Sequence, residues 1–225
     1  MTATREEAEE AADRVPGSRL SARLYEPVLW LGEKTGFRRW RHKVVAQVSG
    51  SVLELGAGTG LNLGHYPCGL ERLVLVEPDV HKAKLLAAKP RPPGVSAEIV
   101  RAPGELLPFE DDSFDTVVET LVLCTVADPE ATAAEIRRVL KPDGRFLFME
   151  HVRSDKPRLG RLQDRLEGPW KKFADGCHCN RRTVPMLKAS GFEVEVVAEQ
   201  DKFPMPPVVR PIVSGVARPV ADPAS

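Results

Sequence analysis

The stretch Glu54-Leu55-Gly56-Ala57-Gly58-Thr59-Gly60 joins a short apolar run to three glycines placed at every second position. The run that leads into it, Val52–Leu55, is typical of a buried β-strand. Glycine accepts a positive φ and lets a ligand approach the backbone closely. The stretch therefore predicts a loop that binds a nucleotide-like cofactor at the carboxyl end of a strand.

Spacing and charge narrow the choice of cofactor. A dinucleotide fingerprint requires G-x-G-x-x-G, but here Gly60 comes one position early and Leu61 stands where the third glycine would be. The carboxylate of Glu54 repels a pyrophosphate, whereas it attracts an ammonium and a sulfonium. The loop therefore favours S-adenosylmethionine. Glu77 ends the next apolar run, where its carboxylate can accept hydrogen bonds from both ribose hydroxyls.

Outward from the loop, short β-branched or leucine-rich runs alternate with helical stretches. Strands are predicted at 52–55, 73–76, 97–100, 116–119, 146–149, 192–197 and 208–216, and helices at 79–89, 129–140, 158–174 and 183–190. Strands separated by helices form a parallel sheet that is covered on both faces. The prediction is an α/β, Rossmann-like, doubly wound and mostly parallel seven-stranded sheet with an N-terminal helical lid.

The predicted lid, residues 18–48, is helical with a break at Pro27 and Gly32. Phe37, Trp40, Val44 and Val48 share one face of its second half, and Arg38, Arg39, Arg41 and Lys43 are expected on a solvated face. Residues 1–17 are predicted to be a mobile lead-in whose helix opens with a capping box. The catalytic domain is expected over 18–217, with a substrate-side insert at 151–190 and a tail at 218–225.

The composition of the chain limits the kinds of partner and location that it predicts. Lys and Arg total 32 and Asp and Glu total 32, so no overall field attracts nucleic acid or an anionic surface. The acidic N-terminus differs from a signal peptide and no run has the length of a membrane span, so no membrane anchor and a cytoplasmic location are expected. The four cysteines, at 68, 124, 177 and 179, are too few for a disulfide framework.

Four motifs carry a family resemblance. ELGAGTG, VEP, APGELLPFEDDSFDTVV and EIRRVLKPDGRFLFMEHV, in this order from residue 51 to about 197, resemble the class I S-adenosylmethionine-dependent methyltransferases related to quinone-biosynthesis C-methyltransferases. The family often has an acid where this chain has Pro103, so the adenine contact is expected from backbone and Glu105. The cofactor-binding residues that the resemblance and the loop imply are Glu54, Gly56, Ala57, Gly58, Gly60, Asn62, Glu77, Pro78, Gly104, Glu105 and Thr120.

A narrower resemblance concerns the acceptor. TLVLCTVADP, EHV and GPWKKFADGCHC resemble the mammalian methyltransferase-like proteins that methylate small alkyl thiols. It implies a small-molecule thiol acceptor. Those relatives carry a hydrophobic anchor at the front, where this chain has an acidic helix. Two alternatives stay open, namely methylation of a phenolic oxygen or activated carbon, and a binding module without catalysis.

Candidate side chains for the chemistry lie near the carboxyl ends of the strands. His151 follows the fifth strand and is a candidate base, although it could instead form only a structural hydrogen bond to backbone. Glu150 should point to the opposite side. Five residues are candidates for the acceptor pocket: Tyr25, Trp30, Trp170, Asp175 and Cys177. For Tyr25 and Trp30, packing in the core is the alternative. Cys177-His178-Cys179 supplies at most three ligands, so no metal is predicted. The sequence leaves the oligomeric state open.

Overall fold

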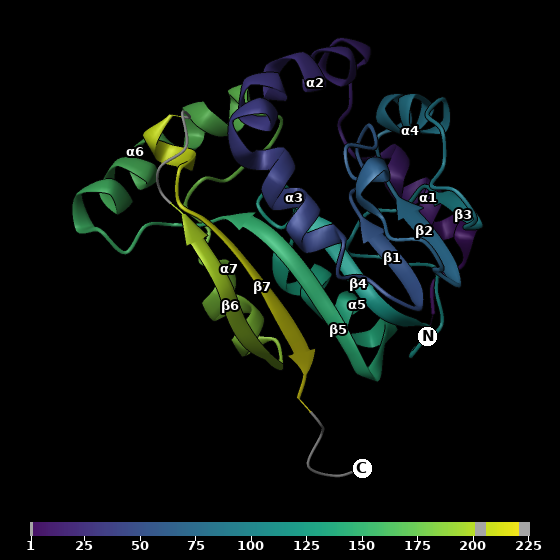
Figure 1. Ribbon diagram of the computed structural model, residues 1–225. Helices are drawn as coiled ribbons and strands as arrows, with labels where there is room; N and C mark the ends of the chain where they lie inside the picture. The colour runs from purple at the N-terminus through teal and green to yellow at the C-terminus, as the bar shows by residue number, and fades with distance from the viewer. Residues whose placement is uncertain (1, 201–205, 221–225) are drawn as a thin grey trace.

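Seven strands form one sheet in the order β3-β2-β1-β4-β5-β7-β6 (Figure 1). The computed structural model describes residues 2–200 and 206–220. The strands are β1 Ser51–Leu55, β2 Arg72–Val76, β3 Ala97–Val100, β4 Phe114–Thr120, β5 Leu140–His151, β6 Phe192–Gln200 and β7 Ile212–Pro219. Neighbours from β3 to β5 pair in parallel, and β7 runs antiparallel to both β5 and β6. The predicted fold class is confirmed.

The central strands read as continuous apolar runs because both of their faces are covered. Every residue of β1 and β2 after the first is buried, as expected for parallel strands between two helical layers. The helices are α1 Arg5–Asp13, α2 Arg19–Gly32, α3 Arg38–Val45, α4 Val80–Ala87, α5 Pro129–Val139, α6 Pro157–Phe173 and α7 Thr183–Ala189.

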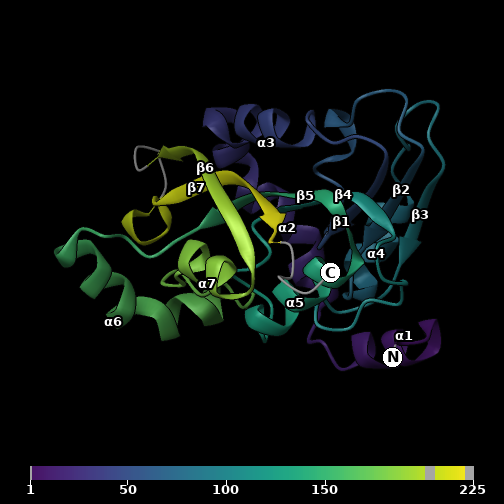
Figure 2. The same cartoon turned by 90° about the horizontal axis from the view of Figure 1, so that it is seen from below.

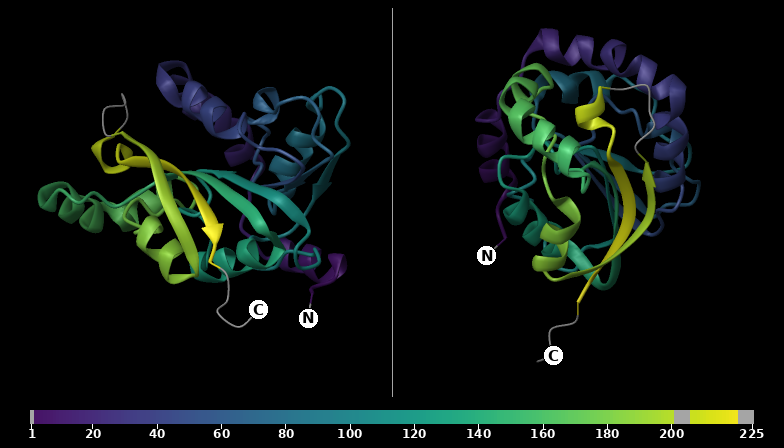
Figure 3. Two further views of the ribbon diagram at one scale, coloured as in Figure 1. Left: turned by 60° about the horizontal axis from the view of Figure 1, so that its bottom comes forward. Right: turned by 90° about the vertical axis from the view of Figure 1, so that its left-hand side faces the viewer.

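Two hydrophobic clusters fill the two sides of the sheet. One contains residues of α1, α5 and α7, and the other contains residues of α3 and α4. Figure 2 shows α3 on the opposite side of the sheet from α1, α5 and α7. Helix α2 lies beyond the carboxyl ends of the parallel strands (Figures 1 and 3), where it covers the glycine loop. No helix in the described part of the chain has the length and apolarity needed to cross a membrane.

The predicted helix break at Pro27 is wrong. α2 continues through Pro27, and the chain bends instead over Glu33–Phe37, a π-helical turn in which Gly36 has φ 156°. Pro27 is exposed, so the carbonyl that loses its hydrogen bond to the missing proline N–H can be solvated by water. The bend then occurs at Gly36, where the backbone is least restricted.

The last strand also begins later than expected. Residues 207–209 form a 3-10 turn, and β7 starts at Ile212, because Pro207 and Pro211 have no N–H to donate to a sheet. The expected tail at 218–225 therefore starts inside β7, and its residues 221–225 lie outside the described ones. Ala8 of α1 is buried in the core, which does not favour a mobile lead-in. The division into 1–17, 18–217 and 218–225 stays a prediction.

Candidate active site

The glycine loop leaves β1 and turns beneath α2. Gly56, Gly58 and Gly60 all have positive φ, at 62°, 57° and 87°. A Cβ on Gly56 would collide with Val122, and one on Gly60 with two leucines, whereas a Cβ on Gly58 would meet nothing nearer than 3.9 Å. The first and third glycines thus permit close packing, and Gly58 keeps the ligand side of the loop open.

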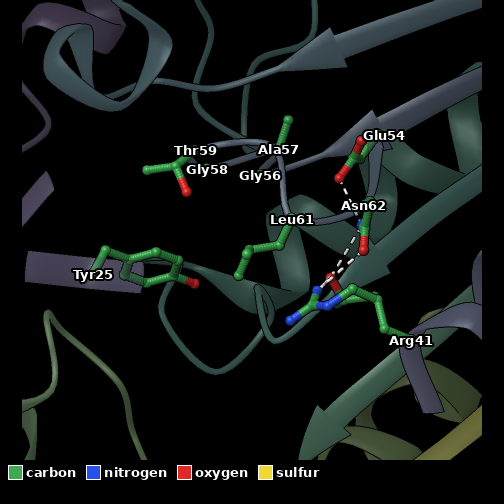
Figure 4. Close-up of a pocket in the computed structure, with 10 residues that line it drawn as sticks. Tyr25, Arg41, Glu54, Gly56, Ala57, Gly58, Thr59, Leu61 and Asn62 are labelled. Carbon is green, nitrogen blue, oxygen red and sulfur yellow. Dashed lines mark hydrogen bonds between the residues drawn. The ribbon is translucent and has the colours of Figure 1, made fainter. Parts of the chain in front are cut away.

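A small cavity, open in part to solvent, lies against this loop (Figure 4). It is lined by Tyr25, Arg41, Glu54, Gly56, Ala57, Gly58, Thr59, Leu61, Asn62 and Thr120. Figure 4 shows Glu54 and Arg41 on either side of Asn62. These lining residues come from five places in the chain: α2, α3, the end of β1, the glycine loop and the end of β4.

Glu54 is a buried carboxylate with both oxygens engaged. Asn62 Nδ2 donates to its Oε1 at 2.6 Å, and the Tyr66 hydroxyl donates to its Oε2 at 2.5 Å. Burial raises the pKa of Glu54, and these two hydrogen bonds oppose that rise. Each oxygen keeps a second lone pair, so the carboxylate can still accept a hydrogen bond from a cation in the cavity.

Arg41 contradicts the expectation of a solvated face. Its guanidinium is buried, and its Nη1 donates to Asn62 Oδ1 at 3.1 Å and to Thr120 Oγ1 at 2.5 Å. Its Nη2 pairs with Glu33 at 2.8 Å. Phe37 and Val45 lie four residues before and after Arg41, so the helix period places Arg41 on their buried side. That spacing was the available signal.

Leu121 is a second residue that the sequence did not single out. It follows Thr120 at the end of β4 with φ 65°, a conformation that bulky side chains rarely adopt. Its N–H donates to the Met149 carbonyl at 2.7 Å, which holds the turn against β5. Strained backbone of this kind concentrates at ligand sites.

Five of the predicted cofactor residues lie outside the lining of the cavity: Gly60, Glu77, Pro78, Gly104 and Glu105. Glu77 accepts from the N–H groups of Gly58 at 2.7 Å and Asp79 at 2.9 Å, so it supports the loop. Burial raises its pKa. Glu105 accepts from the Asp128 N–H at 3.0 Å, at the start of α5. Their contacts with the cofactor stay predictions.

Tyr25 and Asp175 lie near each other, although 150 residues separate them. The Tyr25 ring is 3.9 Å from the Cβ position of Gly58. Lys82 of α4 lies 5.0 Å from the centre of that ring and pairs with Asp175 at 2.6 Å. Trp30 does not join them: it is 55% exposed, with the Lys34 ammonium 4.2 Å above its ring.

Cys177 and Trp170 lie beside the loop that follows β4. The Cys177 thiol contacts the Cys124 thiol, which lowers the pKa of Cys177 against the effect of burial. Trp170 packs on a small cluster formed by Cys179, Val208 and Val209. The thiol of Cys179 donates a hydrogen bond to the Gln163 carbonyl at 3.8 Å. Among the described residues no group of three His, Cys, Asp or Glu side chains could hold a metal ion.

His151 and Glu150 point to opposite faces of the sheet, as predicted. Glu150 accepts from the Cys124 N–H at 3.2 Å, and the His151 ring meets Phe37 edge-on with centroids 6.3 Å apart. Burial lowers the pKa of His151 to about 4, against an opposing backbone hydrogen bond at Val209. The imidazole is therefore neutral at ordinary pH, and its Nδ1 has no partner within the described chain.

Comparison with known proteins places the chain in a family. Residues 53–148 match the model of a methyltransferase domain. The chain is 37% identical to thiol S-methyltransferase TMT1B of Rattus norvegicus over 70% of its length and 66% of that protein, so it spans just under two thirds of this relative. It is 34% identical to human thiol S-methyltransferase TMT1A over 74% of its length and 70% of that protein.

More distant matches agree in fold. A demethylmenaquinone methyltransferase of Renibacterium salmoninarum is 35% identical over half of the chain. A Thermotoga maritima methyltransferase structure, described as a possible histamine N-methyltransferase, superposes with a TM-score of 0.66 at 21% identity, covering 89% of this chain and 96% of that one. The chain belongs to the S-adenosylmethionine-dependent methyltransferase family, in which its relatives include the thiol S-methyltransferases.

Proposed function

We propose that this protein transfers a methyl group from S-adenosylmethionine to a small-molecule thiol. The observation that carries the proposal is the cavity beneath α2, where Glu54 and Arg41 present opposite charges on one side of an open Gly58. The methionine part of the cofactor is a zwitterion. Glu54 suits its ammonium and Arg41 suits its carboxylate. The donor set therefore fits the family's cofactor.

The residues of the chain have four roles in this mechanism. When bound, the cofactor supplies an electrophilic methyl group on its sulfonium. Glu54 and Arg41 hold the two ends of the zwitterion, and Gly58 leaves the space that it needs. Tyr25 covers the loop, with Lys82 and Asp175 behind it, so that water is excluded while acceptor and methyl group are aligned.

Acidity of the acceptor favours a thiol over a phenol. The only chemical help that a thiol needs is loss of a proton with a pKa of roughly 8.5, whereas a phenol has a pKa of roughly 10. An imidazole whose pKa is about 4 is a weak base, and a weak base is more effective for the more acidic acceptor. The names of the relatives TMT1B and TMT1A support the same choice.

Turnover with labelled cofactor tests the proposal. Purified protein would be incubated with labelled S-adenosylmethionine and separate panels of alkyl thiols, phenols and quinones. We expect transfer to thiols, and calorimetry should give cofactor binding with no measurable affinity for NAD. Transfer to a phenol or quinone alone would overturn the acceptor. Cofactor binding without transfer to any panel would favour a non-catalytic module.

If His151 acts as a base, its removal should change how the rate of thiol methylation depends on pH. Because neutral imidazole is available down to about pH 5, His151→Ala should slow thiol methylation most where free thiolate is scarce. We expect a loss of roughly tenfold near pH 6, which shrinks to within about twofold near pH 9. The exposed His42→Ala serves as control. A loss that is equal at every pH would mean that His151 only positions the substrate or supports the fold.

Small molecules are the partners that we propose, and the cytoplasm is the location. The balance of 32 basic and 32 acidic residues gives no reason to invoke nucleic acid. Four cysteines without a framework of pairs suit a reducing compartment. Co-purification with nucleic acid, or fractionation outside the cytoplasm, would contradict these two statements.

A further inference from the structure

Helix α6 presents a stripe of exposed apolar side chains. Leu162, Leu166 and Phe173 are 40%, 37% and 78% exposed. At about 100° per residue, these three positions fall within about 40° of one another around the helix axis. They form one continuous stripe, here named the α6 stripe. A stripe of this kind is energetically unfavourable in water unless something covers it.

The buried side of α6 is fixed, so the stripe does not turn inward. Gln163 is fully buried, and its Nε2 donates to the carbonyls of Cys179 at 2.8 Å and Val208 at 2.9 Å. Gly160 is also buried. Figures 1 and 3 show α6 at the periphery of the molecule, on the same end as α2.

Basic residues lie along one side of the stripe, where Arg158, Arg161, Arg165 and Lys172 fall within about 100° of Leu162 around the helix axis. α6 contains five of them, Arg158, Arg161, Arg165, Lys171 and Lys172. Of its two acids, Asp164 is paired with Arg153 at 2.7 Å, and Glu167 lies 2.6 Å from the imidazole of His178, whose pKa is lowered by burial. Within residues 2–200 and 206–220, no ion pair involves Arg158, Arg165 or Lys172. A chain with equal numbers of acids and bases thus concentrates positive charge along its exposed apolar stripe.

We propose that α6 docks this protein on an anionic lipid surface. An amphipathic helix with an apolar stripe and basic flanks lies in the plane of a membrane interface, with apolar side chains among the acyl chains and cations at the headgroups. Leu162, Leu166 and Phe173 supply the first part and Arg158, Arg165 and Lys172 the second. Two copies facing each other through this helix would oppose like charges, so a second copy is the poorer occupant.

The position of α6 connects this surface to the active site. The helix ends at Phe173, and two residues later Asp175 pairs with Lys82 beside Tyr25. Docking through the α6 stripe would therefore bring the Tyr25 side of the active site close to the lipid. The inference does not rest on the identity of the acceptor, because it depends only on α6.

Vesicle flotation of the full-length protein tests the proposal. Vesicles of phosphatidylcholine mixed with phosphatidylglycerol would be compared with vesicles of phosphatidylcholine alone. We expect binding to the mixed vesicles that weakens at high salt. Phe173→Ser should weaken it roughly tenfold, and Arg165→Glu at least about fivefold. Val220→Ser and Lys188→Glu are matched controls, because Val220, just after β7, and Lys188, on α7, are exposed away from α6; both variants should bind as the parent does.

Several results would overturn the docking proposal. These are equal binding to the two kinds of vesicle, no binding to either, and controls that lose binding as much as the α6 variants. If light scattering detects a dimer of the parent protein that dissociates in the Phe173→Ser variant, the stripe is an interface with a second copy instead. Calorimetry with S-adenosylmethionine, run on every variant, reports the active site separately, so failure of one proposal is distinguishable from failure of the other.

Discussion

We expect Gly58→Val to lower the affinity for S-adenosylmethionine by at least about 100-fold while the protein stays folded. A β-branched residue at φ 57° is strained by about 1–3 kcal/mol, which lowers the stability of the fold. The added side chain would also project into the open side of the loop. Calorimetry of cofactor binding and thermal unfolding measure the two effects.

Gly69→Val separates backbone strain from occupation of the cavity. Gly69 has φ 83°, and a Cβ there would have no neighbour within 4 Å, so the variant carries similar strain away from the site. It should bind the cofactor as the parent does. If Gly58→Val binds normally, the loop does not approach the ligand as we describe. If both variants lose binding equally, the effect lies in the stability of the fold.

The parallel half of the sheet could be predicted from sequence because its central strands, β1, β2 and β4, are buried on both faces. Apolar runs such as 73–76 are unambiguous when no solvent-facing residue interrupts them. The loop after β1 was equally predictable, because glycine at three alternate positions indicates a backbone that a ligand approaches closely. The start of β7 was harder to predict. It depends on prolines, which have no N–H to donate to the sheet, and the apolar content of the segment does not show where the pairing begins.

The lid is helical as predicted, but the break at Pro27 and the directions of Trp30 and Arg41 were predicted wrongly, and helix geometry accounts for these errors. With a break at Pro27, Tyr25 and Trp30 could both face the site. In the continuous α2 they lie about 140° apart around the axis, so Tyr25 reaches the cavity whereas Trp30 faces solvent. Arg41 was missed for a related reason, because an arginine among four basic residues was assigned by type rather than by its spacing from Phe37.

Closure over the site also involves contacts that no local pattern contains. Glu26 of α2 accepts from the Thr59 hydroxyl at 2.6 Å and pairs with Lys89 at 2.5 Å. These two contacts tie α2 to the glycine loop and to the chain just after α4, and neither follows from residue spacing within one element.

The second large effect is expected at Arg41. Arg41→Met should lower the affinity for S-adenosylmethionine by roughly 10- to 100-fold, because a charge-assisted hydrogen bond to a carboxylate contributes about 1.5–3 kcal/mol. The same change should leave the affinity for 5′-methylthioadenosine nearly unchanged, since that molecule has the adenosine and sulfur but no amino-acid tail. Calorimetry with both ligands measures the difference.

A buried arginine also supports its neighbours, so the test needs a variant that balances the charge. Arg41→Met leaves Glu33, its partner at 2.8 Å, without a cation, whereas Arg41→Met combined with Glu33→Gln leaves no unpaired charge. If Arg41 holds the carboxylate, both variants should lose affinity for S-adenosylmethionine to the same extent and keep their affinity for 5′-methylthioadenosine. If the affinity for 5′-methylthioadenosine falls as far as that for S-adenosylmethionine, Arg41 acts through Asn62 and Thr120 by shaping the cavity, and the zwitterion has another partner.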